Sequence, residues 1–217
     1  RLFVKAAMGY SNVYAGRADM QKILSFLLEA RERVKNLHEQ FNEILLEMHI
    51  AKYERLCSQF DKALDRFERA FSSVESLNNP ALTNAATVFH TYFLFWQGRF
   101  RNVIEVYEKT VPEVDRYPVG QFPIVAAMMV GHCYTMIGQI TQGLGMLDAI
   151  HNYCLRQGDS YLSSHASASI AMVMLSINRI EDASRYLRLS LKEASKSDNR
   201  WVSSLDALML SLTSYLK

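Results

Sequence analysis

The chain has 217 residues and a formal net charge of +2 at pH 7. Because 49% of its residues are hydrophobic and 21% are charged, the composition excludes a disordered chain and indicates a globular one. The small net charge offers no concentrated basic face for a phosphate backbone, so we expect no direct nucleic-acid partner. The few prolines (4) and glycines (9) predict long regular elements joined by short turns.

One pattern recurs along the chain at a step of 40 residues, in the stretches CSQFDKALDRF (57–67), QGRFRNVIEVY (97–107), IGQITQGLGML (137–147) and INRIEDASRYL (177–187). One phase of the pattern holds residues that tolerate the left-handed backbone of a tight turn: Ser58, Gly98, Gly138 and Asn178. Two residues later come apolar side chains that we expect to plug the space beneath the turn: Phe60, Phe100, Ile140 and Ile180.

Two further columns predict close helix packing. Upstream of the turn the residue is always small: Ala51, Thr91, Gly131 and Ala171. Downstream, a column of mostly small residues is followed four positions later by a column of large ones: Ala63, Val103, Gly143 and Ala183, then Phe67, Tyr107, Leu147 and Leu187. Residues four apart lie on one helix face, so these columns predict one buried face on each side of the turn.

A second turn falls at Asn78, Pro118, Gly158 and Asp198. Each unit is therefore a helix A, a turn, a helix B and a second turn. We expect hairpins at about 2–36, 38–77, 81–116, 121–157 and 160–197, and a lone helix at 200–217. Because a hairpin cannot bury its apolar face alone, such units stack. The predicted fold is an all-α, right-handed superhelix (solenoid) of antiparallel helix hairpins with a 40-residue period.

We expect a single domain over residues 1–217. The chain begins at Arg1 without an initiator Met, and its last helix, WVSSLDALMLSLTSYL, is too apolar for a polar cap. We therefore expect a fragment of a longer chain.

These residues resemble the tetratricopeptide repeat family. CSQFDKALDRFERAF matches the second half of that repeat with Ala63, Phe67 and Ala70, and GHCYTMIGQ matches the first half with Gly131 and Gly138. The Trp and Leu of helix A and the closing Pro are mostly missing, and the period is 40 rather than 34. The longer unit resembles the repeat arrays of bacterial MalT-type transcriptional regulators and related signal-transducing ATPases. The resemblance implies a sensor or scaffold segment that accompanies a nucleotide-hydrolysing switch module.

The sequence contains no GxxxxGK[ST], GxGxxG, HExxH or GxSxG motif, so we expect no enzyme activity, no catalytic residue and no cofactor. The pairs His132-Cys133 and His151-x-x-Cys154 come nearest to a zinc site. Alternatively, these four residues are buried side chains on packed helix faces. The absence of tight CxxC spacing favours this second interpretation.

From Tyr117 to Leu147 the chain carries no charge unless His132 is protonated. Such a run is typical either of a membrane span or of a helix packed on several sides. Gln121, Gln139 and two prolines favour the second interpretation, so we expect no membrane contact. We also find no signal peptide, and thiols in apolar patterns indicate a reducing compartment. We therefore expect a cytoplasmic protein.

We expect the A helices to line a concave groove. One row of groove positions holds Tyr10, Lys52, Tyr92, His132 and Met172, and a neighbouring row holds Tyr14, Arg55, Phe95, Trp96, Met128 and His165. Aromatic, Met and cationic side chains are common in binding grooves. The alternative is that several, Phe95 and Met128 especially, pack between units. The candidate groove residues are Tyr10, Tyr14, Lys52, Arg55, Tyr92, Trp96, His132 and Met172.

The resemblance bears on the ligand as well. The chaperone-tail clamp subfamily holds a peptide carboxylate with Asn and Lys at the first row, where this chain has no Asn. That ligand is therefore disfavoured.

The helix at 141–157 is the second candidate surface. Between Tyr117 and Ile180 the only charged residues are Asp148, Arg156, Asp159 and Arg179, although outer helices normally carry many charges. This helix is either a surface for self-association or domain docking, or a polar surface solvated by Thr, Gln and Asn.

The sequence thus favours a non-catalytic binding and sensor array of a bacterial cytoplasmic regulator, such as a transcriptional activator. Its groove would take a protein, a peptide or a small effector. The alternative is an adaptor or assembly scaffold that binds a peptide or subunit. A weaker third hypothesis is an appendage that positions an enzyme domain.

Overall fold

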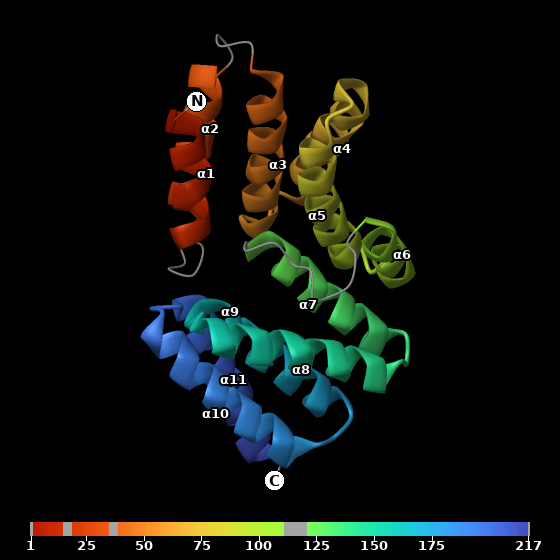
Figure 1. Cartoon of the computed structure of the whole chain (residues 1–217). Helices are drawn as coiled ribbons and strands as arrows, with labels where there is room; N and C mark the ends of the chain where they lie inside the picture. The colour runs from red at the N-terminus through yellow and green to blue at the C-terminus, as the bar shows by residue number, and fades with distance from the viewer. Residues whose placement is uncertain (1, 15–18, 35–38, 111–120, 217) are drawn as a thin grey trace. The chain divides into compact units, whose positions relative to one another are not determined.

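A computed structural model describes residues 2–14, 19–34, 39–110 and 121–216, and all the elements within these ranges are α-helices (Figure 1). In chain order they are α1 (Leu2–Tyr14), α2 (Met20–Val34), α3 (Gln40–Leu56), α4 (Phe60–Leu77), α5 (Pro80–Trp96), α6 (Phe100–Thr110), α7 (Gln121–Met136), α8 (Ile140–Gln157), α9 (Ser160–Ser176), α10 (Ile180–Lys196) and α11 (Arg200–Tyr215).

The chain divides into two compact units, Arg1–Phe93 and Leu94–Lys217, with α5 crossing the division. Within each unit, consecutive helices contact one another, α1 with α2 and α3 with α4 in the first, α7 with α8 and α9 with α10 in the second. The predicted all-α, tetratricopeptide-like array of helix hairpins is confirmed. That residues 1–217 act as one domain stays a prediction.

The turns inside the hairpins α3–α4, α5–α6, α7–α8 and α9–α10 have the expected chemistry. Ser58, Gly98, Gly138 and Asn178 have φ of 63°, 72°, 89° and 59°, which is the left-handed region. The residue that follows each one donates its N–H to a carbonyl five residues earlier, as in Gln139 to Tyr134 at 2.8 Å. This closure satisfies a carbonyl that the end of helix A would otherwise leave unpaired.

The turn between hairpins is also left-handed at its centre. Asn78, Gly158 and Asp198 have positive φ, and Pro118, expected at the same phase, lies outside the described residues. The next residue caps the following A helix through its side-chain oxygen. Leu162 donates its N–H to Asp159 Oδ1 at 2.9 Å, and Asn79 and Asn199 act in the same way.

One sequence expectation about these turns is wrong. Phe60 does not plug the space beneath its turn, because its side chain is 60% exposed. Phe100, Ile140 and Ile180 are only partly buried. The residue at this phase is the first of helix B, where the chain has just left the turn and few neighbours surround it.

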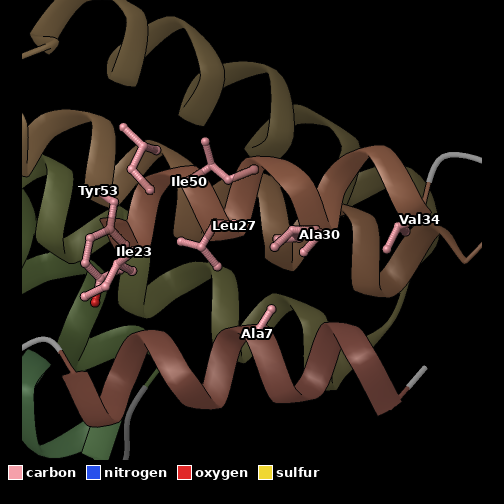
Figure 2. Packing of buried hydrophobic residues seen from close by; sticks show 9 residues of the cluster. Ala7, Ile23, Leu27, Ala30, Val34, Ile50 and Tyr53 are labelled. Atoms are coloured by element: carbon pink, nitrogen blue, oxygen red, sulfur yellow. The ribbon is translucent and has the colours of Figure 1, made fainter. Parts of the chain in front are cut away.

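The core of the first unit joins α1, α2 and α3 (Figure 2). Ala7, Ile23, Leu27 and Tyr53 are buried together, and the Tyr53 hydroxyl donates a hydrogen bond to the carbonyl of Ser11 at 2.5 Å. Burying large apolar side chains of this kind contributes about 1.5–3 kcal/mol each. The apolar face of one hairpin is therefore covered by the first helix of the next.

The small columns lie where α7 and α8 approach closely in the second unit. A Cβ at Gly131 would lie 2.8 Å from Leu147 Cγ, and a Cβ at Gly143 would lie 2.5 Å from the Gly131 carbonyl oxygen. Ala51, Thr91 and Ala171 at the same phase as Gly131 are also buried. The sequence prediction of small residues at a helix contact is confirmed.

We expect Gly143→Ala to destabilise the chain by about 2 kcal/mol or more, because its methyl group would meet backbone atoms that cannot rotate away. Gly145→Ala on the same helix is the matched control, since a Cβ there has nothing within 4 Å. The control should instead gain about 1 kcal/mol of helix propensity. Urea unfolding of both variants checks this, and equal effects would contradict the close approach.

Candidate binding surface

The second unit exposes apolar side chains on its A helices. Helix α7 contacts α9, and α9 contacts α11. Three positions on α7 and their equivalents 40 and 80 residues later, the last of which is the C-cap of α11, are exposed or partly exposed. We name these residues the A-helix face: Met129, His132, Met136, Ser169, Met172, Ser176, Met209, Leu212 and Leu216. Met136 is 62% exposed, Met172 44% and Leu212 48%. A contiguous exposed apolar surface is typical of an interaction site.

The A-helix face carries no Asp, Glu, Lys or Arg. Its only titratable group is His132, and burial lowers the pKa of that imidazole from 6.5 to about 4. His132 is therefore neutral at pH 7, and the whole face is uncharged.

Trp96 extends this region at the end of α5. Its indole is about half exposed (52%), and its ring lies 5.3 Å from that of Phe95. The Phe95 ring lies in turn 6.3 Å from the His132 ring. Of the sequence-predicted groove residues, Trp96, His132 and Met172 therefore belong to the second unit and are at least partly exposed. Phe95 packs partly buried among aromatic neighbours, and Met128 is buried, as the alternative interpretation had it.

The remaining predicted groove residues lie in the first unit. Arg55 donates a hydrogen bond from Nη1 to the Tyr92 hydroxyl at 3.0 Å, and burial raises the pKa of Tyr92 more than Arg55 lowers it. Lys52 Nζ lies 5.4 Å from the Tyr53 ring centroid, and burial lowers the pKa of Lys52 to about 8. Tyr10 packs against Phe26 of α2, with ring centroids 5.1 Å apart.

Tyr14 lies in α1, and its side chain is outside the described residues. Because the two units are described separately, a single groove running through both stays a prediction.

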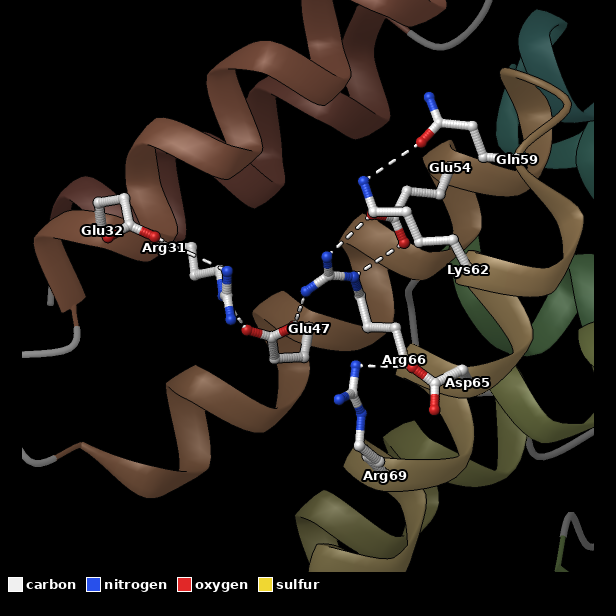
Figure 3. Close-up of polar contacts among 9 residues, drawn as sticks. All are labelled: Arg31, Glu32, Glu47, Glu54, Gln59, Lys62, Asp65, Arg66 and Arg69. Atoms are coloured by element: carbon white, nitrogen blue, oxygen red, sulfur yellow. Dashed lines mark hydrogen bonds and ion pairs between the residues drawn. The ribbon is translucent and has the colours of Figure 1, made fainter.

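An ion network that sequence reasoning missed crosses α2, α3 and α4 (Figure 3). Arg66 forms a bidentate pair with the fully buried Glu54, at 2.8 and 2.9 Å, and also contacts Glu47. Arg31 contacts the other oxygen of Glu47, and Lys62 Nζ lies 3.0 Å from Glu54 Oε1. Burial alone would raise the pKa of Glu54, but hydrogen bonds from Arg66 and Lys62 lower it.

Three members of the network, Arg31, Glu47 and Arg66, line a pocket of about 400 Å³. Its charged lining residues are Arg31, Glu43, Glu47, Arg66 and Arg69. Arginine and glutamate pair with each other here, so the pocket has little charge left for a ligand. We assign the network to the stability of the first unit.

We expect Arg66→Met to destabilise the first unit by about 3–5 kcal/mol, because it leaves the Glu54 carboxylate buried without its main partner. The matched control is Arg69→Met, one turn further along α4, whose guanidinium is exposed and pairs with exposed Asp65. That control should cost about 0.5 kcal/mol or less. Urea unfolding compares the two, and similar losses would show that the buried pair does not hold the unit.

Asp206 is a second group that sequence reasoning missed. Both of its oxygens are buried without a hydrogen-bond partner among the described residues. Burial raises its pKa from 3.8 to about 6, and the nearby Ser190 hydroxyl lowers it only in part. The residues 40 and 80 positions earlier are Ala166 and Ala126, which are also buried. An aspartate thus occupies a position that the array elsewhere gives to alanine.

We expect the second unit to lose stability as pH rises from about 4 to about 6. The folded state holds the Asp206 proton up to its raised pKa of about 6, whereas the unfolded chain releases it near 3.8. Asp206→Asn should remove this loss and be more stable than the parent at pH 7 by about 1–3 kcal/mol.

Unfolding curves from pH 4 to 7 would measure the difference between Asp206→Asn and the parent chain. Asp65→Asn, which alters an exposed carboxylate, is the control and should leave the profile nearly unchanged. Parallel profiles for Asp206→Asn and the parent would contradict the raised pKa.

Of the residues considered for a zinc site, Cys133, His151 and Cys154 are buried, whereas His132 is partly exposed on the A-helix face. Within the described ranges, no group of three or more His, Cys, Asp or Glu residues could hold a metal ion. Burial raises the pKa of both Cys133 and Cys154 to about 12, so both thiols stay protonated at pH 7. His151 Nδ1 lies 3.1 Å from Ser167 Oγ, but both residues are buried between α8 and α9 and closed to a substrate.

The outer helix α8 exposes small and polar side chains. Gly145, Ala149 and Asn152 are exposed, and Leu155 is 43% exposed. None of the described helices is both long enough and apolar enough to cross a membrane. Whether helix 141–157 is a contact surface stays a prediction.

No protein-family model matches the chain, and no curated protein matches it. Its structure is similar to that of a signal transduction ATPase with numerous domains from Pyrococcus horikoshii that has a tetratricopeptide repeat sensor (TM-score 0.64, 16% identity). The match covers 98% of this chain and 34% of the archaeal protein, so the chain spans about a third of that protein's length.

Two other solved structures share the fold. BtubC from P. vanneervenii has a TM-score of 0.58 and 9% identity, and the match covers 92% of each chain. The nearly identical repeats of a Podospora anserina protein named for the kinesin light chain have a TM-score of 0.56 and 11% identity, with 89% of this chain and 96% of that chain covered. The chain is thus a tetratricopeptide-like helical repeat array, a fold that typically serves as a non-catalytic binding module.

Proposed function

We propose that this chain is the non-catalytic binding and sensor array of a bacterial cytoplasmic regulator, such as a transcriptional activator. It takes an effector or a protein partner on the A-helix face, and the chemistry of the parent protein lies in other segments. The observation that carries the proposal is the exposure of Met172 and Leu212 at repeat-equivalent positions of α9 and α11, together with Met136, which lies one helical turn further along α7 than the equivalent position His132. Exposed apolar side chains cost solubility, so their alignment on one face favours a binding role.

The similar archaeal protein supports the sensor assignment, because it is named as a signal transduction ATPase whose tetratricopeptide repeats are its sensor. A neutral, Met-rich surface suits such a role, since Met side chains adapt to ligands of different shape. On the first unit, taken by itself, Lys52, Arg55, Tyr92 and Tyr10 are the candidates for polar contacts with a ligand.

The second candidate function is an adaptor or assembly scaffold. The charge-poor outer surface of α8, with Leu155 exposed beside Gly145 and Ala149, favours it. In that case helix 141–157 docks a second copy or another domain, while the A-helix face holds a peptide or subunit.

A single reporter can separate the two functions. Trp201→Phe leaves Trp96 as the only tryptophan, and labelling with 5-fluorotryptophan then gives one ¹⁹F resonance at the edge of the A-helix face. A bacterial lysate is divided by dialysis into small molecules and macromolecules, and each fraction is titrated against the labelled chain. We expect the small-molecule fraction to shift the resonance if the array is a sensor, and the macromolecular fraction if it is a scaffold.

The matched control adds Met172→Glu to the same labelled chain. It places a charge on the A-helix face and should abolish the shift. If neither fraction moves the Trp96 resonance, or if the shift survives Met172→Glu, binding on this face is contradicted.

A further inference from the structure

The two units differ in the charge of their A helices. In the first unit Lys52 and Arg55 lie on α3 and reach the rings of Tyr53 and Tyr92. In the second unit, by contrast, the A-helix face has only Met, Leu, Ser and a neutral His132. A ligand on the second unit therefore meets no fixed charge.

The surroundings of the face are uncharged as well. The whole of α7 and the whole of α9 lack Asp, Glu, Lys and Arg. On α11 the charged residues are Arg200, at the first position of the helix, and the buried Asp206. A charged group pressed onto this surface would lose water and gain no ion pair, which costs several kcal/mol. The surface thus selects a partner that is uncharged where it makes contact.

Backbone hydrogen bonding decides the partner's conformation. An extended peptide must find partners for its N–H and C=O groups, and an apolar wall of Met and Leu side chains offers few. The polar groups of the face are only Ser169, Ser176 and His132. Ser176 already donates its hydroxyl to the Val173 carbonyl at 2.7 Å. A helix satisfies its own backbone, so it can lie on this surface without unpaired groups.

We infer, resting on the proposed function, that the A-helix face of the second unit binds an amphipathic helix of a protein partner through an uncharged apolar stripe. Packed helices lie about 8–10 Å apart, so α7, α9 and α11 span roughly 20 Å, and a helix of about 18 residues, roughly 27 Å long, crosses all three. Its anchors at i, i+3, i+4 and i+7 contact Met136, Met172 and Leu212 in turn.

The test uses three fluorescein-labelled synthetic peptides of about 18 residues, each titrated against the chain by fluorescence anisotropy. The first has Leu at helical spacing with Gln and Ser elsewhere. The second has the same composition with Leu at alternating positions. The third keeps the helical Leu spacing but replaces Gln by Glu throughout, including the positions that flank the stripe. We expect the first peptide to bind at least tenfold more tightly than the other two, with little dependence on salt.

Two charge variants place the contact. Met172→Glu on α9 should weaken binding of the first peptide at least tenfold, whereas Leu155→Glu on α8 should leave it unchanged. The two parent side chains are equally exposed, at 44% and 43%, so the pair separates the A-helix face from general surface hydrophobicity. Circular dichroism of both variants confirms that they fold.

The outcomes separate this inference from the proposed function. Preference for the alternating or acidic peptide, or equal losses for both variants, overturns the amphipathic helix as partner. If no peptide binds while a lysate fraction still shifts the Trp96 resonance, the inference fails and the binding array stands. If no peptide binds and no lysate fraction shifts the Trp96 resonance, both the inference and the proposed function fail.

Discussion

The left-handed residue that follows α3, α5, α7 and α9 is the constraint on which the rest of the array depends. Gly98 and Gly138 adopt it without strain, and Ser58 and Asn178 adopt it at a modest cost, since Asn enters this region more readily than most residues. The reversal places helix B beside helix A, so that the face holding Gly143 meets the face holding Gly131. A hairpin formed in this way still exposes apolar residues, and only the next hairpin covers them.

The two units bury polar groups in different ways. The first unit uses charge: Glu54 and Arg66 occupy positions where the next repeat has Leu94 and Val106. The second unit buries the carboxylates of Glu193, which pairs with Lys196 Nζ at 2.7 Å, and of Asp206, but most of its buried polar groups are neutral. Ser190, for example, donates its hydroxyl to the Ser164 carbonyl at 2.8 Å. Buried ion pairs contribute little net stability but penalise any packing that separates them, so the first unit is held in one register. Neutral side chains place no such demand on their neighbours.

The sequence predicted the parts of this structure that repeat. Turns at a step of 40 residues, small residues at helix contacts and large residues four positions on all follow from backbone sterics and helical periodicity. The prediction that Phe60 is buried beneath its turn was wrong, because periodicity gives the phase of a residue but not how many neighbours surround it at a helix start. The pair of Arg66 and Glu54 was missed because the next repeat has Leu94 and Val106 at the equivalent positions, so the two charges form no column.

The candidate site was predicted only in part, for a related reason. The phase analysis selected Met172, His132 and Trp96, which are exposed or partly exposed, and their place in a binding groove stays a prediction. It missed Met136 and Leu212, which lie 40 residues after Trp96 and Met172, because these two phases were not carried on to the next A helix. Asp206 was missed because a single aspartate in a helix is taken from the sequence as solvated, and only the burial of Ala166 and Ala126 at the same phase indicates otherwise.

Different columns of the repeat pack the helices and form the A-helix face, which explains how an exposed apolar surface can exist on a stable array. Contacts within a hairpin use the columns of Gly131 and Gly143, and the core uses side chains such as Leu147 and Leu187. Met136, Met172 and Leu212 take little part in either, because about half of each side chain remains in water. Exchanging them therefore costs little folding energy. Substitutions on the A-helix face can thus adapt it to a partner without altering the fold. A charge placed on this face should affect binding more than folding.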